Sequence, residues 1–365
     1  MDFERQNQTW KKEKGALGFE TWNKKNSFFG ALAWSPLNTT EEYQEVVAVL
    51  TNNERVHIFH PPKKLENKWS HFFNVTKAME DFLNKEVFQD KFNKISFKER
   101  RKMLAATSLT WTSVTKEGEK RQSFLLVCTQ AGTCVVLECE LPLRVETLSV
   151  SSKFDICKEN YVTCIKWVED INLAVLGESN GTFSFWAKKM EGKFSLEKVS
   201  INFGSQDARA VSMMEVKRAG NQNFLLLAKG TKFHFYSFFW EEKGINLEEF
   251  PCKEELLSKI FSQISGIRFC SSHEFVINYM DGNLLFFGVQ QFPTKQVLGR
   301  QRYYFKLPQA ELFLSSHALL VSPHSYFAHL LHNLKDINKK SVFLPLILKQ
   351  FNEGEILSKY KEAER

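Results

Sequence analysis

Residues 162–186 read VTCIKWVEDINLAVLGESNGTFSFW, and this stretch decides the fold. An apolar segment ends at Trp167, a nearly continuous apolar segment follows over Ile171–Ser179, and an alternating segment follows the pair Asn180-Gly181. The Asn-Gly pair adopts positive φ with little strain, so it suits the two-residue turn between antiparallel strands. The stretch therefore predicts three consecutive antiparallel strands, with the middle one covered on both faces.

The same strand–turn–strand unit recurs along the chain, both before and after this stretch. Its other copies are Phe28–His60 (turn Asn52-Asn53), Ser108–Leu141 (turn Ala131-Gly132), Ala210–Phe239 (turn at Gly230), Ile264–Val289 (turn Asp281-Gly282) and, more weakly, His317–Leu331. Repeats of this kind, at intervals near the roughly 40–50 residues of a blade, are typical of propellers. We predict an all-β fold, a WD-repeat-like β-propeller with six recognisable blades, or seven with one incomplete. Several separate β domains or a sandwich are the alternative.

The repeats also predict the domain organisation. The propeller is expected over residues 1–340, with its first recognisable blade at 28–62 and a helical, basic insertion at 77–106. A short helical extension is expected at 341–365. Residues 1–27 contain apolar side chains but neither a second apolar strand nor a tight turn. We therefore expect the ring to be incomplete beside the blade that contains Trp34, where this segment or a partner subunit would cover the strand edges.

Composition limits the compartment and the chemistry. The charge of +7, from 49 basic and 42 acidic residues, is too mild to require nucleic-acid binding. No apolar run reaches the length of a membrane span, and Met1–Lys14 is polar, so we expect neither a transmembrane helix nor a secretory signal. The seven cysteines contain no C-x-x-C pair, which favours a reducing compartment without structural zinc. We predict no metal and no cofactor.

Residues 31–82 carry a more specific pattern. A strand ends in Trp34-Ser35-Pro36, an apolar strand and a polar turn follow, and the next strand ends in Pro61-Pro62 before Trp69 and a helix-like segment. This order resembles a propeller blade of the 90-kilodalton subunit of general transcription factor IIIC. The order of the later blades is similar as well, and the tail Ser341–Tyr360 is similar to the helical segment that follows that propeller.

The resemblance implies a nuclear, non-catalytic scaffold subunit that acts in RNA polymerase III preinitiation assembly. Its partners would be other subunits of transcription factor IIIC and the polymerase III machinery, with DNA within the complex, but no membrane and no small-molecule ligand. The chain departs from the family in two places. It stops at Arg365 without the Cys/His zinc-binding domain, and it has only about 28 residues where the family has a further blade.

Two alternative functions stay open. The family implies a link to histone acetyltransferase activity, but the sequence has no Arg/Gln-x-x-Gly-x-Gly loop of the kind that binds pyrophosphate. A cytoplasmic WD-type adaptor is the other alternative. Paired acids at Glu241-Glu242, Glu248-Glu249 and Glu254-Glu255 are interpreted as solvated charges of an interblade loop, and no catalytic residue is predicted.

One segment is a candidate for partner contact. The densest positive charge lies in KFNKISFKERRK, residues 91–102, with the basic residues Lys91, Lys94, Lys98, Arg100, Arg101 and Lys102. Basic residues interleaved with Phe92 and Phe97 suit a phosphate backbone, an acidic partner or a nuclear address. A plain solvated helix face is the alternative. His329 and His332 lie three apart in a predicted strand, which places them on opposite faces and argues against a metal pair.

Overall fold

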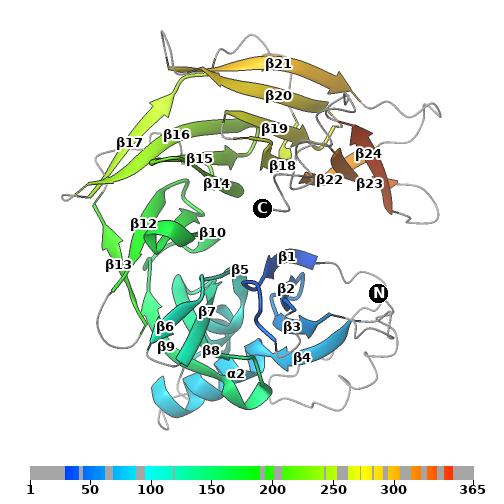
Figure 1. The fold of residues 1–365 in the computed structure, drawn as a ribbon. Helices are drawn as coiled ribbons and strands as arrows, with labels where there is room; N and C mark the ends of the chain where they lie inside the picture. The colour runs from blue at the N-terminus through cyan, green and yellow to red at the C-terminus, as the bar shows by residue number, and fades with distance from the viewer. Residues whose placement is uncertain are drawn as a thin grey trace. The chain divides into compact units, whose positions relative to one another are not determined.

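The computed structural model describes residues 29–40, 44–61, 69–87, 95–117, 120–189, 194–200, 208–241, 244–252, 262–271, 273–281, 283–290, 295–304, 314–321, 327–334 and 341–347. The chain divides into two compact units, unit 1 (Met1–Val211) and unit 2 (Ser212–Arg365). The described strands form six antiparallel sheets (Figure 1), named here blades 1–6 in chain order. Blades 1–3 belong to unit 1 and blades 4–6 to unit 2.

Unit 1 contains three blades and the helices. Blade 1 consists of β1 (Phe29–Trp34), β2 (Val47–Thr51), β3 (Val56–His60) and β4 (Ser70–Asn74). Next come α2 (Val75–Phe82), a π-helical turn (Leu83–Val87) and α3 (Phe97–Leu104). Blade 2 consists of β5 (Ala106–Trp111), β6 (Thr115–Glu117), β7 (Lys120–Thr129), β8 (Thr133–Leu141) and β9 (Leu148–Asp155), with a 3-10 turn at Val145–Thr147. Blade 3 consists of β10 (Val162–Val168), a 3-10 turn (Glu169–Ile171), β11 (Leu173–Glu178), β12 (Phe183–Lys188) and β13 (Leu196–Val199).

Unit 2 contains strands only among its described residues. Blade 4 consists of β14 (Met213–Ala219), β15 (Gln222–Lys229), β16 (Lys232–Glu241) and β17 (Gly244–Phe250). Blade 5 consists of β18 (Ile264–Phe269), β19 (Glu274–Tyr279), β20 (Asn283–Gln290) and β21 (Gln296–Tyr304). Blade 6 consists of β22 (Leu314–Val321), β23 (Phe327–Leu334) and β24 (Ser341–Ile347).

The repeated hairpins form where the turn residues predict them. β11 and β12 pair antiparallel around Asn180-Gly181, and Gly181 has φ of 85°. β19 and β20 pair antiparallel around Asp281, while Gly282 lies outside the described residues. In blade 1 the turn at Asn52-Asn53 also includes Glu54, a non-glycine residue at φ of 62°. The predicted strand–turn–strand unit is therefore confirmed in blades 1–5.

The middle strands are covered on both faces, as their continuous apolar sequences predict. β2 and β11 are buried at every residue. In unit 1 one core cluster joins blades 1 and 2 through Leu50, Ile58 and Leu125, and a second joins blades 2 and 3. In unit 2 a core rich in phenylalanine joins blades 4 and 5, and each fully buried Phe contributes about 2–3 kcal/mol to folding.

Two tryptophans brace neighbouring blades of unit 1 through their indole N–H groups. Trp111 on β5 donates to the carbonyl oxygen of Ala33 on β1, at 3.2 Å. Trp167 on β10 donates to the hydroxyl of Ser113 in blade 2, also at 3.2 Å. A buried indole N–H without an acceptor would cost about 1–3 kcal/mol. These bonds therefore help to fix adjacent blades against each other.

Three expectations need correction or extension. Blades 1–5 each carry a fourth main strand that the repeat did not predict, so blade 1 extends past residue 62 to Asn74. A helical extension was expected over 341–365, but residues 341–347 form β24, which pairs with β23. Pro345 lacks the N–H and clashes with the preceding turn inside a helix, but it is tolerated on the outermost strand of a sheet. Residues 1–28 and 348–365 lie outside the described residues. The incomplete ring expected beside the blade of Trp34 stays a prediction, because closing the ring would require a contact between the two units.

Candidate interaction surface

The predicted basic segment is partly helical. Lys98, Arg100, Arg101 and Lys102 lie on α3, whereas Lys91 and Lys94 lie outside the described residues. The helix begins at Ser96, whose hydroxyl accepts from the backbone N–H of Glu99 at 3.3 Å. The Glu99 carboxylate in turn accepts from the backbone N–H of Ser96, at 3.2 Å. This reciprocal capping box explains why a helix begins here despite its charge.

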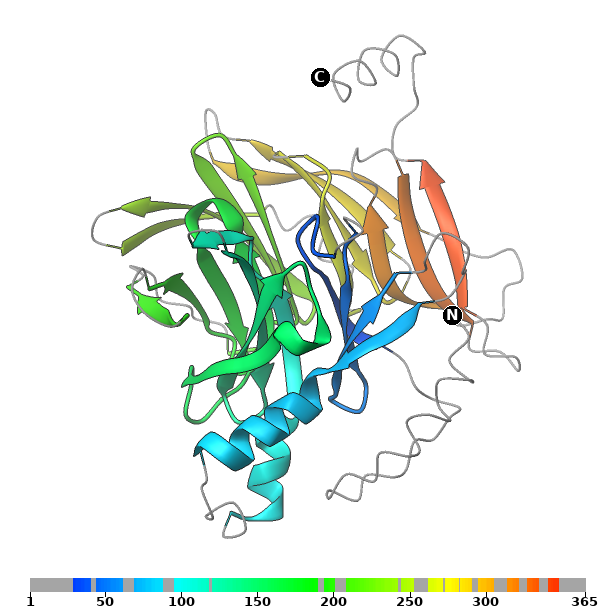
Figure 2. The ribbon, with the colours of Figure 1, turned by 60° about the horizontal axis from the view of Figure 1, so that its bottom comes forward.

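α3 is seated firmly on the strand turns beside it. Its buried Leu104 joins the core between blades 1 and 2. The backbone N–H of Ala131, in the β7–β8 turn, donates to the carbonyl oxygen of Lys102 at 3.1 Å. The Arg101 guanidinium lies 3.7 Å from the carboxylate of Glu54, in the β2–β3 turn. The helix therefore bridges blades 1 and 2, and in Figure 2 the helical segments (light blue to cyan) lie at one end of unit 1.

One face of α3 points to solvent. Lys98 and Lys102 are exposed, the Arg101 side chain is 56% exposed, and Phe97 is 51% exposed. Arg100 differs from the other predicted basic residues because it is only half-exposed and lies on the side of Leu104. The structure thus brings together Lys98, Arg101 and Lys102, and it adds Phe97 as an apolar member. We call these four residues the α3 face.

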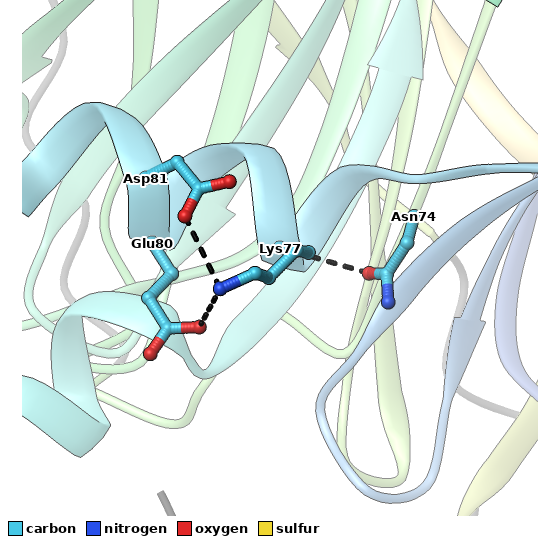
Figure 3. A network of polar contacts seen from close by, with 4 residues as sticks. All are labelled: Asn74, Lys77, Glu80 and Asp81. Atoms are coloured by element: carbon cyan, nitrogen blue, oxygen red, sulfur yellow. Dashed lines mark hydrogen bonds and ion pairs between the residues drawn. The ribbon is translucent and has the colours of Figure 1, made fainter. Parts of the chain in front are cut away.

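A polar network on α2 was not predicted from the sequence. The Asn74 side chain caps the helix by accepting from the backbone N–H of Lys77, at 3.0 Å. The Lys77 ammonium lies 3.3 Å from Glu80 and 3.2 Å from Asp81 (Figure 3). Burial by itself would lower the pKa of Lys77, but the hydrogen bond to Asp81 and the charge of Glu80 raise it. The spacings i, i+3 and i, i+4 in the sequence were the available signal.

A histidine pair, with His57 buried and His71 half-buried, lies on the face of blade 1 that carries Trp34. His57 Nδ1 lies 3.1 Å from His71 Nε2, across β3 and β4. Burial, the charge of His71 and the charge of Arg55 lower the pKa of His57 to about 3. Val47, Val49 and Phe59 form a small cluster on this face with Trp69, whose ring meets Trp34 edge-on at 5.6 Å. His57 is therefore neutral near pH 7, and its ring contacts His71 within blade 1.

The acidic pairs and cysteines form no shared site in the described residues. Glu241 ends β16, and Glu248 and Glu249 lie on β17, whereas a loop was expected. The Glu248 carboxylate lies 2.5 Å from Lys295 Nζ, and the Glu249 carboxylate lies 2.9 Å from His234 Nδ1. Glu242, Glu254 and Glu255 lie outside the described residues. All seven cysteines are free thiols, and burial followed by the charge of Glu178 raises the pKa of Cys157 to about 11. Among the described residues, no group of three His, Cys, Asp or Glu side chains lies close enough together to hold a metal ion.

His329 and His332 lie on β23, as the predicted strand requires. Their spacing places them at positions on opposite faces of the sheet. No helix of the described ranges is both long enough and apolar enough to cross a membrane.

Comparison with known proteins identifies the fold and the family. No curated protein matches the sequence. Among solved structures, the crystal structure of Saccharomyces cerevisiae Sqt1 is similar with a TM-score of 0.51 and 11% identity, covering 89% of this chain and 78% of that chain. At this identity the likeness concerns the fold alone. It agrees with the predicted all-β propeller architecture.

The family model is more specific. The model of the transcription factor IIIC subunit delta β-propeller domain matches residues 20–298, which contain blades 1–4 and most of blade 5. It confirms the predicted kinship with a transcription factor IIIC subunit. The chain therefore belongs to the family of the transcription factor IIIC subunit delta β-propeller domain, and is a component of that complex.

Proposed function

We propose that this chain is a non-catalytic scaffold of transcription factor IIIC that holds other subunits during RNA polymerase III preinitiation assembly in the nucleus. The family match over residues 20–298 supports membership of the transcription factor IIIC complex. The observation that carries the scaffold role is a set of large apolar side chains left exposed on the blades and on the segments that connect their strands. In unit 1 these are Leu32, Trp34, Leu37, Phe97, Val145 and Tyr161, and in unit 2 they are Phe239 and Trp240.

Exposed aromatic side chains on fixed strands are typical of protein–protein contact. Trp34 is 53% exposed at the end of β1, and Trp240 is 46% exposed near the end of β16. Tryptophan and tyrosine are enriched among the residues that dominate binding energy at interfaces. Their backbones are held by strand pairing, so they lose little conformational freedom on binding. This arrangement favours a partner-binding role over catalysis.

Affinity purification from nuclear extract tests the proposal. The tagged full chain is expected to co-purify with the other transcription factor IIIC subunits and with polymerase III, as identified by mass spectrometry. An unrelated propeller with the same tag is the control. Recovery of cytoplasmic assemblies instead would favour the adaptor alternative.

A second assay tests the non-catalytic part. The purified chain is incubated with histones and labelled acetyl-coenzyme A, and no transfer above the protein-free control is expected. Transfer that scales with the concentration of the chain would contradict the scaffold assignment.

A further inference from the structure

α3 carries a pair of like charges on its exposed side. Lys98 and Lys102 are separated by four residues and therefore repel each other on the same side of the helix. Neither has an ion-pair partner among the described residues. Glu99, the one acid of the helix, is turned back to Ser96, whose hydroxyl lies 2.9 Å from its carboxylate. The helix thus keeps an uncompensated positive side.

An apolar side chain lies beside this charge. Phe97 precedes Arg101 by one helical turn and is 51% exposed, although Leu104 of the same helix is fully packed into the core. Phe97 and Arg101 form one column of the α3 face, and Lys98 and Lys102 form the next. The face therefore combines an aromatic anchor with three cations on one side of eight helical residues.

The face is also fixed before any partner arrives. The bond from Ala131 to Lys102 and the ion pair between Arg101 and Glu54 hold the helix against two blades. The backbone N–H of Gln130 donates to the carbonyl oxygen of Ala105 at 2.9 Å, which closes the end of the helix. A surface held in this way costs little ordering on binding.

We propose that the α3 face binds an acidic protein segment that carries one apolar side chain. Carboxylates of the segment lie at Lys98 and Lys102, and its apolar side chain packs on Phe97. The inference rests on the proposed function, since it places the segment in another protein of the same assembly. Complementary charge steers the encounter, and the apolar contact supplies the anchor.

Duplex DNA fits the face less well. A helix of eight residues is about 12 Å long, and Lys98 and Lys102 would neutralise about two phosphates, because Arg101 is already paired with Glu54. Such a contact supplies only a small part of the charge neutralisation that duplex binders use. An aromatic side chain such as Phe97 contributes to nucleic-acid binding by stacking on exposed bases, and a duplex keeps its bases stacked inside. The combination of charge and aromatic surface favours a protein segment.

Direct binding to the purified full chain tests the inference. The probe is a short fluorescent peptide in which Asp and Glu residues surround one Leu, and the readout is fluorescence anisotropy at low and moderate salt. We expect saturable binding that weakens with salt. Lys98→Ala with Lys102→Ala should weaken it about tenfold, and Phe97→Ala by a similar factor.

Matched variants distinguish binding at the α3 face from a nonspecific effect of positive charge. Lys217→Ala with Lys232→Ala removes two exposed lysines of unit 2 and should leave binding unchanged. Lys98→Arg with Lys102→Arg keeps the charge and should retain binding. Thermal unfolding of each variant confirms that the fold is intact. Equal binding by wild type and the Ala variants, or loss of duplex-DNA binding without loss of peptide binding, would overturn the inference.

The same variants in the affinity purification distinguish this inference from the proposed function. If the wild-type chain recovers no transcription factor IIIC subunit, the proposed function fails. If it recovers them and the Phe97, Lys98 and Lys102 variants recover them equally, the proposed function stands and the α3 face is not the contact.

Discussion

The buried His57 of blade 1 makes the stability of the chain depend on pH. His57 is 4% exposed, and burial, the charge of His71 and the charge of Arg55 lower its pKa from 6.5 to about 3. The unfolded chain therefore binds a proton at His57 more readily than the folded chain. The contribution to stability is complete above about pH 6.5 and is lost progressively as the pH falls toward 3.

The magnitude follows from the size of the shift. One pKa unit corresponds to about 1.4 kcal/mol, so lowering the pH from 7 to 5 should cost about 2 kcal/mol at His57 alone. His57→Gln removes the titrating group and should abolish this part of the pH dependence. The variant itself will be less stable at pH 7 because its amide must replace a packed ring. The difference between the two pH profiles, and not the absolute stability, carries the prediction.

Urea unfolding at several pH values measures both profiles. Trp34 and Trp69 lie on the same face of blade 1, so tryptophan fluorescence includes a report on this blade. Wild type should lose more stability than His57→Gln between pH 7 and 5, by about 2 kcal/mol. Parallel profiles of the two proteins would show that His57 titrates normally and that its buried neutral state is not present in solution.

Three further predictions concern particular residues. Gly132→Ala should destabilise the chain by more than about 2 kcal/mol in urea unfolding, because φ is +73° and a Cβ would overlap the backbone carbonyl oxygens of Cys157 and Asn160. Gly220→Ala is its control: φ is +60° but the space is open, so about 1 kcal/mol is expected, and equal losses would contradict the steric argument. Ser96→Ala should remove the cap of α3 and cost about 1 kcal/mol, with faster amide exchange in α3 only; unchanged exchange would show that the capping box is dispensable. Cys157 should be alkylated more slowly than free cysteine at pH 8, and its alkylation rate should increase with pH up to about pH 11, because its pKa is raised. Peptide mass spectrometry measures the rate, and a rate equal to that of free cysteine would refute the raised pKa.

The outer strands that the repeat pattern did not predict in blades 2 and 3 are both partly exposed to solvent. β9 and β13, the fourth strands of blades 2 and 3, are mostly half-exposed or exposed. An outer strand needs few apolar residues because only part of its surface is covered, so its sequence resembles a loop. β24 differs from the expected helical tail for another reason: Pro345 and the β-branched residues of its sequence favour an outer strand.

The hairpins could be predicted from the sequence by itself because their causes are local. Asn180-Gly181 sets the turn geometry, and the apolar run of β11 requires cover on both faces whatever the neighbours are. The basic segment was likewise visible in the residues. Only the tertiary structure decided which part of it faces solvent: Leu104 enters the core, Arg101 meets Glu54, and Phe97 is half-exposed beside Lys98 and Lys102. Those contacts join residues far apart in the chain, so no local pattern determines them.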